Sequence, residues 1–294
     1  MGYGSFTTTS YASYSRSAGK IYDDSTGRVS GQEFKAFRLD ESMDPKRFKL
    51  RECANNEEHP NTVPVILALD VTGSMGRACK ETAEALGVII TNLYEKFRDI
   101  EFCVMGIGDL AYDRAPIQMS QFESDVRIAE ALDKIYMEHG GGGNAYESYT
   151  AAWYMGLKRT KLDAFDKQGR KGIIITMGDE PLNPYLPKYE LNEAANATEQ
   201  GDINTDDLYK QVCEKFDVYH IAVDDVHDCY RDYERSIKNT FGKLLGQNFM
   251  VSTINDLSKT IEDCISKSIE KNGGTSLLLE TPANPVNEKG EIEW

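Results

Sequence analysis

The chain has 294 residues, of which 40% are hydrophobic, so it is long enough to bury a sizeable core. Its 33 Lys and Arg residues against 48 Asp and Glu residues give a formal net charge of -15, which repels phosphate backbones and anionic membrane surfaces. We therefore expect neither a nucleic acid nor a membrane as a partner.

The chain shows no sign of export or of membrane insertion. Its first residues have no basic region followed by an apolar one, and no segment approaches about 18 continuous apolar residues. Six cysteines are spread along the chain without a CxxC pair, which is typical of reduced structural thiols. These features favour a cytoplasmic protein.

Composition divides the chain into four parts. Residues 1–30 are rich in Ser, Thr, Tyr and Gly with few aliphatic side chains, which predicts a flexible N-terminal arm. Residues 31–60 carry spaced Phe and Leu residues among charges, which predicts an extension packed on the core. The core domain is expected over residues 61–272, and the acidic, Pro-containing residues 273–294 are expected to be a disordered tail.

From residue 63 onward, short β-rich runs alternate with runs of helical periodicity, as in βαβ units around a parallel sheet. The predicted strands cover residues 63–69, 101–107, 116–122, 172–177, 218–223 and 249–251. The predicted helices cover residues 77–97, 125–137, 146–159, 208–216, 228–237 and 255–270.

Two local features complete this fold prediction. The connection between residues 107 and 116 is too short for a crossover helix, so the strand at 116–122 is expected to be an antiparallel edge strand. Ser124 is the expected N-cap of the next helix, and residues 182–204 look like an irregular insertion. The predicted class is α/β, with a central, mostly parallel six-stranded sheet and helices on both faces.

Oxygen-bearing side chains follow three of the predicted parallel strands. Asp70, Asp109 and Asp179 come after the strands at 63–69, 101–107 and 172–177. Because the carboxyl ends of neighbouring parallel strands meet at one edge of a sheet, these side chains can converge there. Hard divalent cations prefer such oxygen ligands, so a metal site is the first hypothesis.

The segment Asp70-Val71-Thr72-Gly73-Ser74-Met75 resembles the Asp-x-Ser-x-Ser motif of von Willebrand factor type A (VWA) domains, with Thr in place of the first Ser. The order of elements after it is similar to the Rossmann-like fold of that family, and the resemblance covers about residues 60–272. The N-terminal segment and the Gly-rich loop with Asn144 and Glu147 further resemble a group of bacterial and phage proteins that carry this domain.

The resemblance implies a metal-ion-dependent adhesion site (MIDAS) that holds Mg²⁺, or alternatively Ca²⁺ or Mn²⁺. The hydroxyls of Thr72 and Ser74 would bind the ion directly, and Asp70 directly or through a water. The later family aspartate would be Asp179, although the common Thr-Asp-Gly pattern aligns its Asp with Met177. A thioether does not bind a hard cation, so Asp179 is preferred.

The family threonine of a later loop is missing here. No Thr lies between His139 and Ser148, so Asn144 is the nearest oxygen donor, and Glu147 or Ser148 would contribute through water. Asp109 is either a second-shell group or an ordinary turn residue.

The function implied by the resemblance is metal-dependent protein binding, not catalysis. An Asp or Glu carboxylate of a protein partner would complete the coordination of the ion, and an ATPase partner is suggested by analogy alone. Tyr112, Tyr146 and Tyr149 are expected to form a rim that contacts the partner.

Other interpretations of the same residues stay open at this point. Thr72 and Ser74 could simply cap the helix that follows them, and the site could be vestigial in a structural or assembly protein. A phosphohydrolase of the haloacid dehalogenase type is disfavoured because position 72 is not acidic. A phosphate site at residues 140–143 is disfavoured because that run lacks the Lys and Ser or Thr of a P-loop.

Overall fold

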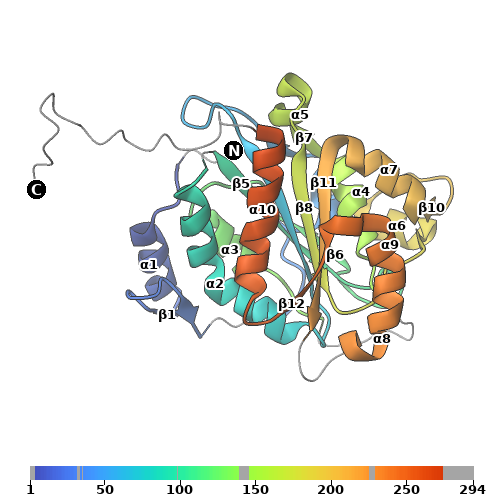
Figure 1. The fold of residues 1–294 in the computed structure, drawn as a ribbon, viewed down its shortest axis with the longest axis horizontal. Coiled ribbons are helices and arrows are strands. Elements are labelled where there is room, and N and C mark those ends of the chain that lie inside the picture. Colours follow the sequence, from blue (N-terminus) through green and yellow to red (C-terminus); the bar gives the residue numbers. More distant parts are fainter. Residues whose placement is uncertain are drawn as a thin grey trace, which may run out of the picture.

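The computed structural model of this protein describes residues 4–31, 34, 36–97, 99–138, 146–224 and 229–273. Its centre is a six-stranded sheet (Figure 1) with the strand order β12-β11-β8-β4-β5-β6. These strands are β4 (Val63–Asp70), β5 (Ile100–Ile107), β6 (Ile117–Met119), β8 (Gly172–Gly178), β11 (Phe216–Asp224) and β12 (Phe249–Thr253).

Strand directions agree with the prediction of a mostly parallel sheet. Every neighbouring pair in this sheet is parallel except β5 and β6, which pair antiparallel with Gly106 opposite Gln118. The short connection at residues 108–116 forces the chain to turn back directly, because a parallel return needs a longer crossover. β6 is therefore an antiparallel edge strand, as predicted.

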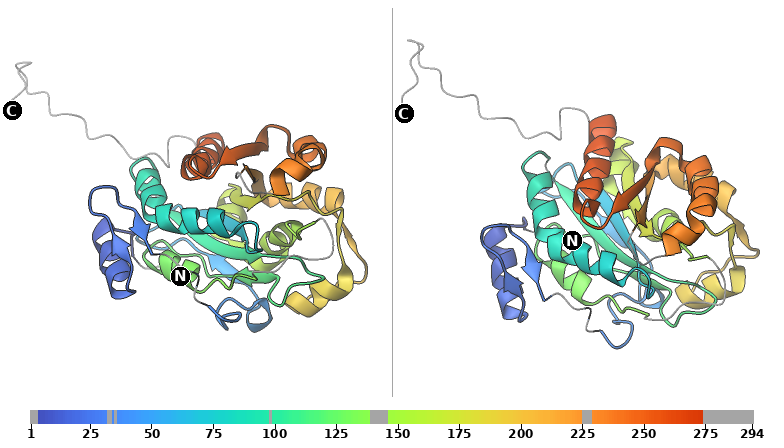
Figure 2. Two further views of the ribbon diagram at one scale, coloured as in Figure 1. Left: turned by 90° about the horizontal axis from the view of Figure 1, so that it is seen from below. Right: turned by 60° about the horizontal axis from the view of Figure 1, so that its bottom comes forward.

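Helices flank the sheet on both faces (Figures 1 and 2). Alternate residues of β4 enter two separate cores: Val65 and Leu67 pack with residues of α2 (Gly76–Tyr94) and α10 (Leu257–Gly273), whereas Ile66 packs with residues of α4. Further helices along the chain are α3 (Arg127–Asp133), α4 (Thr150–Arg159), α5 (Asp163–Gln168), α7 (Thr205–Lys215), α8 (Cys229–Ile237) and α9 (Lys243–Leu245).

Residues 4–30 differ from the expected flexible arm. Helix α1 (Thr8–Ser17) begins with a capping box in which Thr7 accepts a hydrogen bond from the Ser10 amide, and β1 (Ile21–Tyr22) pairs with β2 (Val29–Ser30). Tyr11 of α1 is buried so closely against Gly87 of α2 that a Cβ there would lie 2.2 Å from the tyrosine ring. This segment has few aliphatic residues, so its aromatic side chains supply the apolar area that is buried when it folds.

The insertion at residues 182–204 is also more regular than expected. It contains β9 (Tyr185–Leu186), α6 (Lys188–Ala195) and β10 (Ile203–Asn204), and Leu191 is fully buried. Residues 31–60 contribute β3 (Arg51–Cys53), which pairs in parallel with β7 (Thr160–Leu162). The predicted tail from residue 274 onward lies outside the described residues.

Ser124 does not cap α3, contrary to the expectation. The N-cap position is Val126, and the amide of Arg127 donates instead to the Asp125 carboxylate at 3.0 Å. The Ser124 hydroxyl is fully buried and donates to the Gly4 carbonyl, a tertiary contact that replaces the local one.

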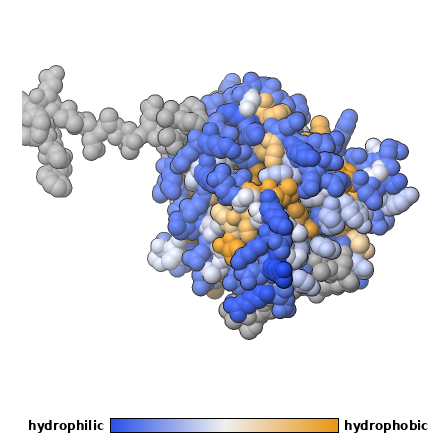
Figure 3. Space-filling model, turned by 45° about the vertical axis from the view of Figure 1, so that its right-hand side comes forward, coloured by the Kyte–Doolittle hydropathy of each residue, from blue (hydrophilic) through white to orange (hydrophobic). Residues whose placement is uncertain are grey.

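The surface in Figure 3 is mainly hydrophilic, with smaller apolar areas, in keeping with the net charge of -15. No helix in the described ranges is both long and apolar enough to cross a bilayer. Five of the six cysteines are free thiols, and four of these are buried.

Candidate functional site

The loop after β4 is organised by its own aspartate. Asp70 ends the strand with no exposed surface, and its Oδ1 accepts hydrogen bonds from the Thr72 amide (2.9 Å) and the Thr72 hydroxyl (2.6 Å). This arrangement is an Asx turn, which a short carboxylate side chain favours where a strand ends. It holds the Thr72 hydroxyl beside the Asp70 carboxylate at the carboxyl edge of the sheet.

A hydrogen bond joins the loop after β4 to the loop after β8. The Ser74 hydroxyl donates to Asp179 Oδ1 at 3.0 Å, although the two residues are 105 positions apart in the sequence. Met177 pairs with Leu69 inside the sheet and has its side chain in the core. The structure therefore places Asp179, and not Met177, beside the Asp70 loop.

Tyr149 belongs to this cluster and not to its rim. Its hydroxyl donates to Asp70 Oδ2 at 2.7 Å and accepts from the Glu180 amide at 3.3 Å. Gly178 makes this approach feasible, because a Cβ at that position would lie 2.0 Å from the Tyr149 hydroxyl oxygen. The tyrosine is 1% exposed, so the expectation that it contacts a partner is wrong.

The other two tyrosines of the expected rim are on the surface. Tyr112 is 58% exposed and Tyr146 is 41% exposed. Tyr146 also lines two surface hollows, of about 490 and 310 Å³, that share Asn183 and Pro184. The smaller of these hollows is also lined by Asp109, so it opens beside the cluster.

The expected second-shell residues hold the neighbouring loops together. Ser148 accepts a hydrogen bond from the Leu110 amide at 3.0 Å, which ties the start of α4 to the loop after β5. Asp109 Oδ1 accepts from the Ala111 amide at 2.8 Å, so Asp109 does form the turn that its position suggested. The Glu147 backbone bridges to Leu182, just beyond Asp179.

Several carboxylate oxygens in this cluster are buried without a hydrogen-bond partner among the described residues. They are Asp109 Oδ2, Glu147 Oε2 and Glu180 Oε2. No ion pair joins any of these three carboxylates to a Lys, Arg or His within the described ranges. Buried acceptors without donors are costly, and such groups call for an explanation.

Burial and the repulsion between neighbouring negative charges raise the pKa values of these acids. Burial, reinforced by the negative charges of Asp70 and Glu180, raises the pKa of Glu147 far above its usual range. Burial and the charges of Asp70 and Asp109 raise the pKa of Glu180 to about 7. Burial also raises the pKa of Asp113 to about 6. A cation among these groups would reverse such shifts, since an opposite charge favours the ionised form.

Burial raises the pKa of Asp70 as well, but here hydrogen bonds oppose it. The Thr72 hydroxyl and amide and the Tyr149 hydroxyl all donate to the carboxylate and favour its charged form. These three hydrogen bonds partly offset the cost of burying the charged form of Asp70.

The donor set fits a hard divalent cation better than a softer metal. Asp70, Thr72, Ser74 and Asp179 offer only carboxylate and hydroxyl oxygens. No three His, Cys, Asp or Glu side chains of the described residues are arranged to hold a metal ion by themselves. An ion here would thus depend on hydroxyl oxygens and waters as well as on two carboxylates. The predicted donor Asn144 lies outside the described residues.

Sequence reasoning missed two members of the cluster, Tyr149 as a donor to Asp70 and Glu180 as an unpaired acid. Gly178 was a usable signal, because a glycine at the end of a buried strand often marks the close approach of another group.

The chain matches no protein-family model and no curated protein sequence. Among solved structures it is similar to the pilus adhesin SpaC from Lactobacillus rhamnosus GG, with 12% identity and a TM-score of 0.44 over 74% of this chain and 32% of that one. It is also similar to proximal thread matrix protein 1 from the mussel byssus, with 10% identity and a TM-score of 0.44 over 69% of this chain and 47% of that one. This chain thus spans less than half the length of either protein, and likeness at this level does not bear on function.

Proposed function

We propose that this chain is a metal-dependent protein-binding module with a Rossmann-like VWA fold. The site at the carboxyl edge of the sheet would hold Mg²⁺, with Ca²⁺ or Mn²⁺ as alternatives, and an Asp or Glu carboxylate of a protein partner would complete its coordination. The residues proposed to hold the ion are Asp70, Thr72, Ser74 and Asp179, together with the predicted donor Asn144.

The observation that carries this proposal is the hydrogen bond between Ser74 and Asp179. Two residues selected from the sequence as ligands of one ion, 105 positions apart, contact each other at 3.0 Å. Asp70 and Thr72 also contact each other, at 2.6 Å. Burial, together with the nearby charges of Asp70 and Asp179, raises the pKa of Tyr149, so both aspartates lie close to it. A capping role for Thr72 and Ser74 accounts for neither contact, because both hydroxyls donate to carboxylates and α2 begins without a side-chain cap.

Charge at this edge supports a cation over an anion or a nucleic acid. Asp109, Glu147 and Glu180 place around the site buried acceptor oxygens that have no hydrogen-bond partner among the described residues. None of these acids is proposed to bind the ion directly, so they would act through bound water and through the electrostatic potential.

The chain's own residues prepare the site. Tyr149 and Thr72 fix both oxygens of Asp70, and Ser74 orients Asp179. When bound, the ion supplies an electrophilic centre for a partner's carboxylate. The exposed Tyr112 and Tyr146 offer the neighbouring contact surface, since tyrosine is favoured at interfaces.

Calorimetric titration with Mg²⁺ and Mn²⁺ tests the metal site. We expect binding to the unsubstituted chain and a loss of at least about tenfold in affinity in Asp179→Asn and in Ser74→Ala, because a ligand oxygen is weakened or removed. Asp163→Asn is the matched control, since Asp163 is a buried aspartate that instead pairs with Lys167. Equal heats in the Asp179 and Asp163 variants would refute the proposal, and absent heats in the unsubstituted chain would favour a vestigial site.

A further inference from the structure

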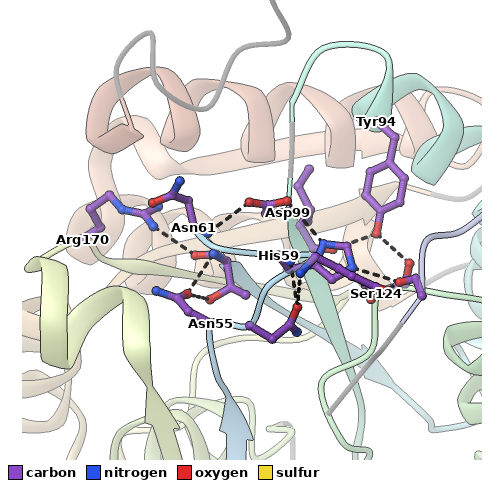
Figure 4. A network of polar contacts seen from close by, with 12 residues as sticks. Asn55, His59, Asn61, Tyr94, Asp99, Ser124 and Arg170 are labelled. Atoms are coloured by element: carbon purple, nitrogen blue, oxygen red, sulfur yellow. Dashed lines mark hydrogen bonds and ion pairs between the residues drawn. The ribbon is translucent and has the colours of Figure 1, made fainter.

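Figure 4 shows a second polar cluster. It lies where β4 and β5 begin, at the end of the sheet opposite to Asp70. It combines His59 from the loop before β4, Asp99 from the loop before β5 and Ser124 from the loop after β6. β4 is eight residues long, at about 3.3 Å each, so this cluster lies roughly 25 Å from Asp70. It is therefore separate from the candidate metal site.

The three side chains are ordered as hydroxyl, imidazole and carboxylate. Ser124 Oγ lies 3.3 Å from His59 Nε2, and His59 Nδ1 lies 3.3 Å from Asp99 Oδ1. The Asn61 amide donates to Asp99 Oδ2 at 3.1 Å, which leaves Oδ1 for the imidazole. In this order a carboxylate orients an imidazole, which can take the proton of a serine hydroxyl.

The backbone of Asp99, the carboxylate member of this cluster, has a strained conformation. Asp99 has a φ of 60°, in the left-handed region that non-glycine residues rarely adopt. Its carbonyl accepts the Val63 amide at 2.7 Å, so the start of β4 fixes it. Such strain is found more often at functional sites than elsewhere.

The N-terminal segment fills the space in front of the serine. The Gly4 carbonyl oxygen lies 2.7 Å from Ser124 Oγ, which donates to it, and 3.0 Å from His59 Nε2. Two residues later, the Phe6 amide donates to the Ser124 carbonyl at 2.8 Å. The Phe6 ring is buried, with its centroid 5.2 Å from that of Tyr11 and 6.5 Å from that of Tyr94.

This segment contacts both the serine and the histidine, but in a pose that does not allow reaction. The Ser124 hydroxyl hydrogen is directed at the Gly4 carbonyl oxygen and not at His59. Both ring nitrogens of His59 face oxygen acceptors, Asp99 and Gly4, and each contact is a hydrogen bond only if the nitrogen carries a hydrogen. With a hydrogen on Nε2, which a hydrogen bond to the Gly4 carbonyl requires, that nitrogen cannot accept the serine proton.

We propose that Ser124, His59 and Asp99 form a nucleophilic site for acyl transfer from peptides or esters, and that residues 4–6 block it as a built-in peptide. With the segment displaced, His59 Nε2 takes the hydroxyl proton as Ser124 Oγ bonds to the acyl carbon. His59 then gives that proton to the leaving amine or alcohol as the carbonyl–heteroatom bond breaks. Water attacks the acyl-serine, its proton passes to His59 and then to the released serine oxygen, and a carboxylic acid leaves.

Two substitutions in the full chain are expected to displace the segment. Gly4 has a φ of 141°, which disfavours any side chain, and a Cβ there would lie 3.2 Å from Asp125 Oδ2. Phe6→Ala removes the buried ring. The combined variant Gly4→Ala/Phe6→Ala is therefore the unblocked form, and Ser5→Ala is its matched control because Ser5 is exposed in the same segment.

A fluorophosphonate probe tests the proposal, because Ser124 Oγ would form a bond to phosphorus as fluoride leaves. We expect labelling of Ser124, located by peptide mass spectrometry, to be at least about tenfold faster in the combined variant than in the unsubstituted chain or Ser5→Ala. Adding His59→Ala to the combined variant should slow labelling by about a hundredfold or more, and adding Asp99→Asn should slow it too. All labelling is done with a chelator present, so metal binding at the other edge does not enter.

Hydrogen exchange of the N-terminal peptide shows whether the segment has been displaced. Faster exchange at Phe6 without labelling of Ser124 would overturn the proposal, and so would labelling that persists after Ser124→Ala. Unchanged exchange in the combined variant would equally overturn it, because Gly4 and Phe6 would then not hold the block.

Discussion

Tyr149 donates its hydroxyl hydrogen to Asp70 Oδ2 at 2.7 Å, inside a part of the protein that is closed to solvent. The tyrosine comes from the start of α4 and the aspartate from the end of β4, so this one contact fixes a helix to the loop that carries the proposed metal ligands. It also offers a donor to a carboxylate whose charged form burial disfavours.

We expect Tyr149→Phe to lower the free energy of unfolding by about 1.5–3 kcal/mol, since a buried carboxylate loses a hydrogen bond and gains no water in exchange. Urea unfolding in the presence of a chelator measures this. Tyr154→Phe is the control, because its hydroxyl bonds to the partly exposed Glu199 and its loss should be smaller. Equal losses in the two variants would contradict the role given to Tyr149.

Gly178→Ala is expected to destabilise the protein by about 1–3 kcal/mol, because the new Cβ would lie 2.0 Å from the Tyr149 hydroxyl oxygen and force it away from Asp70. Gly201→Ala is the matched control, because a Cβ placed there meets no atom of the described residues within 4 Å apart from its own chain neighbours. Thermal unfolding compares the stability of the two variants. A Gly178 variant as stable as the Gly201 variant would show that Tyr149 can move away without cost.

His220 is expected to make stability depend on pH. It is fully buried, its Nδ1 lies 2.8 Å from the Thr176 hydroxyl, and its ring stacks on Phe241 at 3.5 Å between centroids. Burial lowers its pKa from 6.5 to about 3. Between these two values the unfolded chain binds a proton that the folded chain does not, so the stability present above pH 6.5 is lost as the pH falls toward 3.

His220→Phe should remove this contribution, which amounts to at most about 1.4 kcal/mol per pH unit. Urea unfolding of both proteins at several pH values between 4 and 7 gives the slope of the free energy of unfolding against pH for each. The carboxylates are the same in both proteins, so their contribution cancels in the difference between the two slopes. Identical slopes would mean that His220 is protonated in the folded protein.

Lys215 is expected to stabilise the end of α4. Its ammonium group is buried and donates to the carbonyl oxygens of Thr160 at 2.7 Å and Gly156 at 3.4 Å. Lys215→Met would remove both hydrogen bonds, although the Gly156 carbonyl would keep the one that it accepts from the Thr160 hydroxyl, and we expect a cost of about 1–3 kcal/mol in the free energy of unfolding. Lys210→Met should change it by less than about 1 kcal/mol, because that lysine forms an exposed ion pair with Asp207. Chemical denaturation of the two variants compares them, and similar losses would argue against the capping role.

Much of the sheet could be predicted because its strands are buried on both faces. Val63–Asp70 and Gly172–Gly178 read as apolar runs of the right length, and every residue in them is buried. The shared edge of parallel strands then predicted that Asp70 and Asp179 would lie close together. The sequence pattern was enough to predict these strands because the strands on either side of them in the sheet are equally apolar.

Local rules failed where a distant group competed for a side chain. Ser124 has the right residue type for an N-cap, yet its hydroxyl donates to the Gly4 carbonyl, 120 positions away. Residues 4–30 looked too polar to fold, yet Phe6 and Tyr11 bury their rings against the body of the protein. Composition gives the number of apolar side chains in a segment, but not whether another part of the protein offers a surface on which they can be buried.

The sequence by itself determined that the chain is α/β, which strands form the central sheet, and that carboxylates and hydroxyls follow β4 and β8. The tertiary structure alone decided that Ser74 reaches Asp179, that Tyr149 points inward to Asp70, and that Ser124 and His59 meet the N-terminal segment. Periodicity and strand ends are properties of neighbours along the chain, whereas these contacts depend on which loops the folded sheet brings within hydrogen-bonding distance.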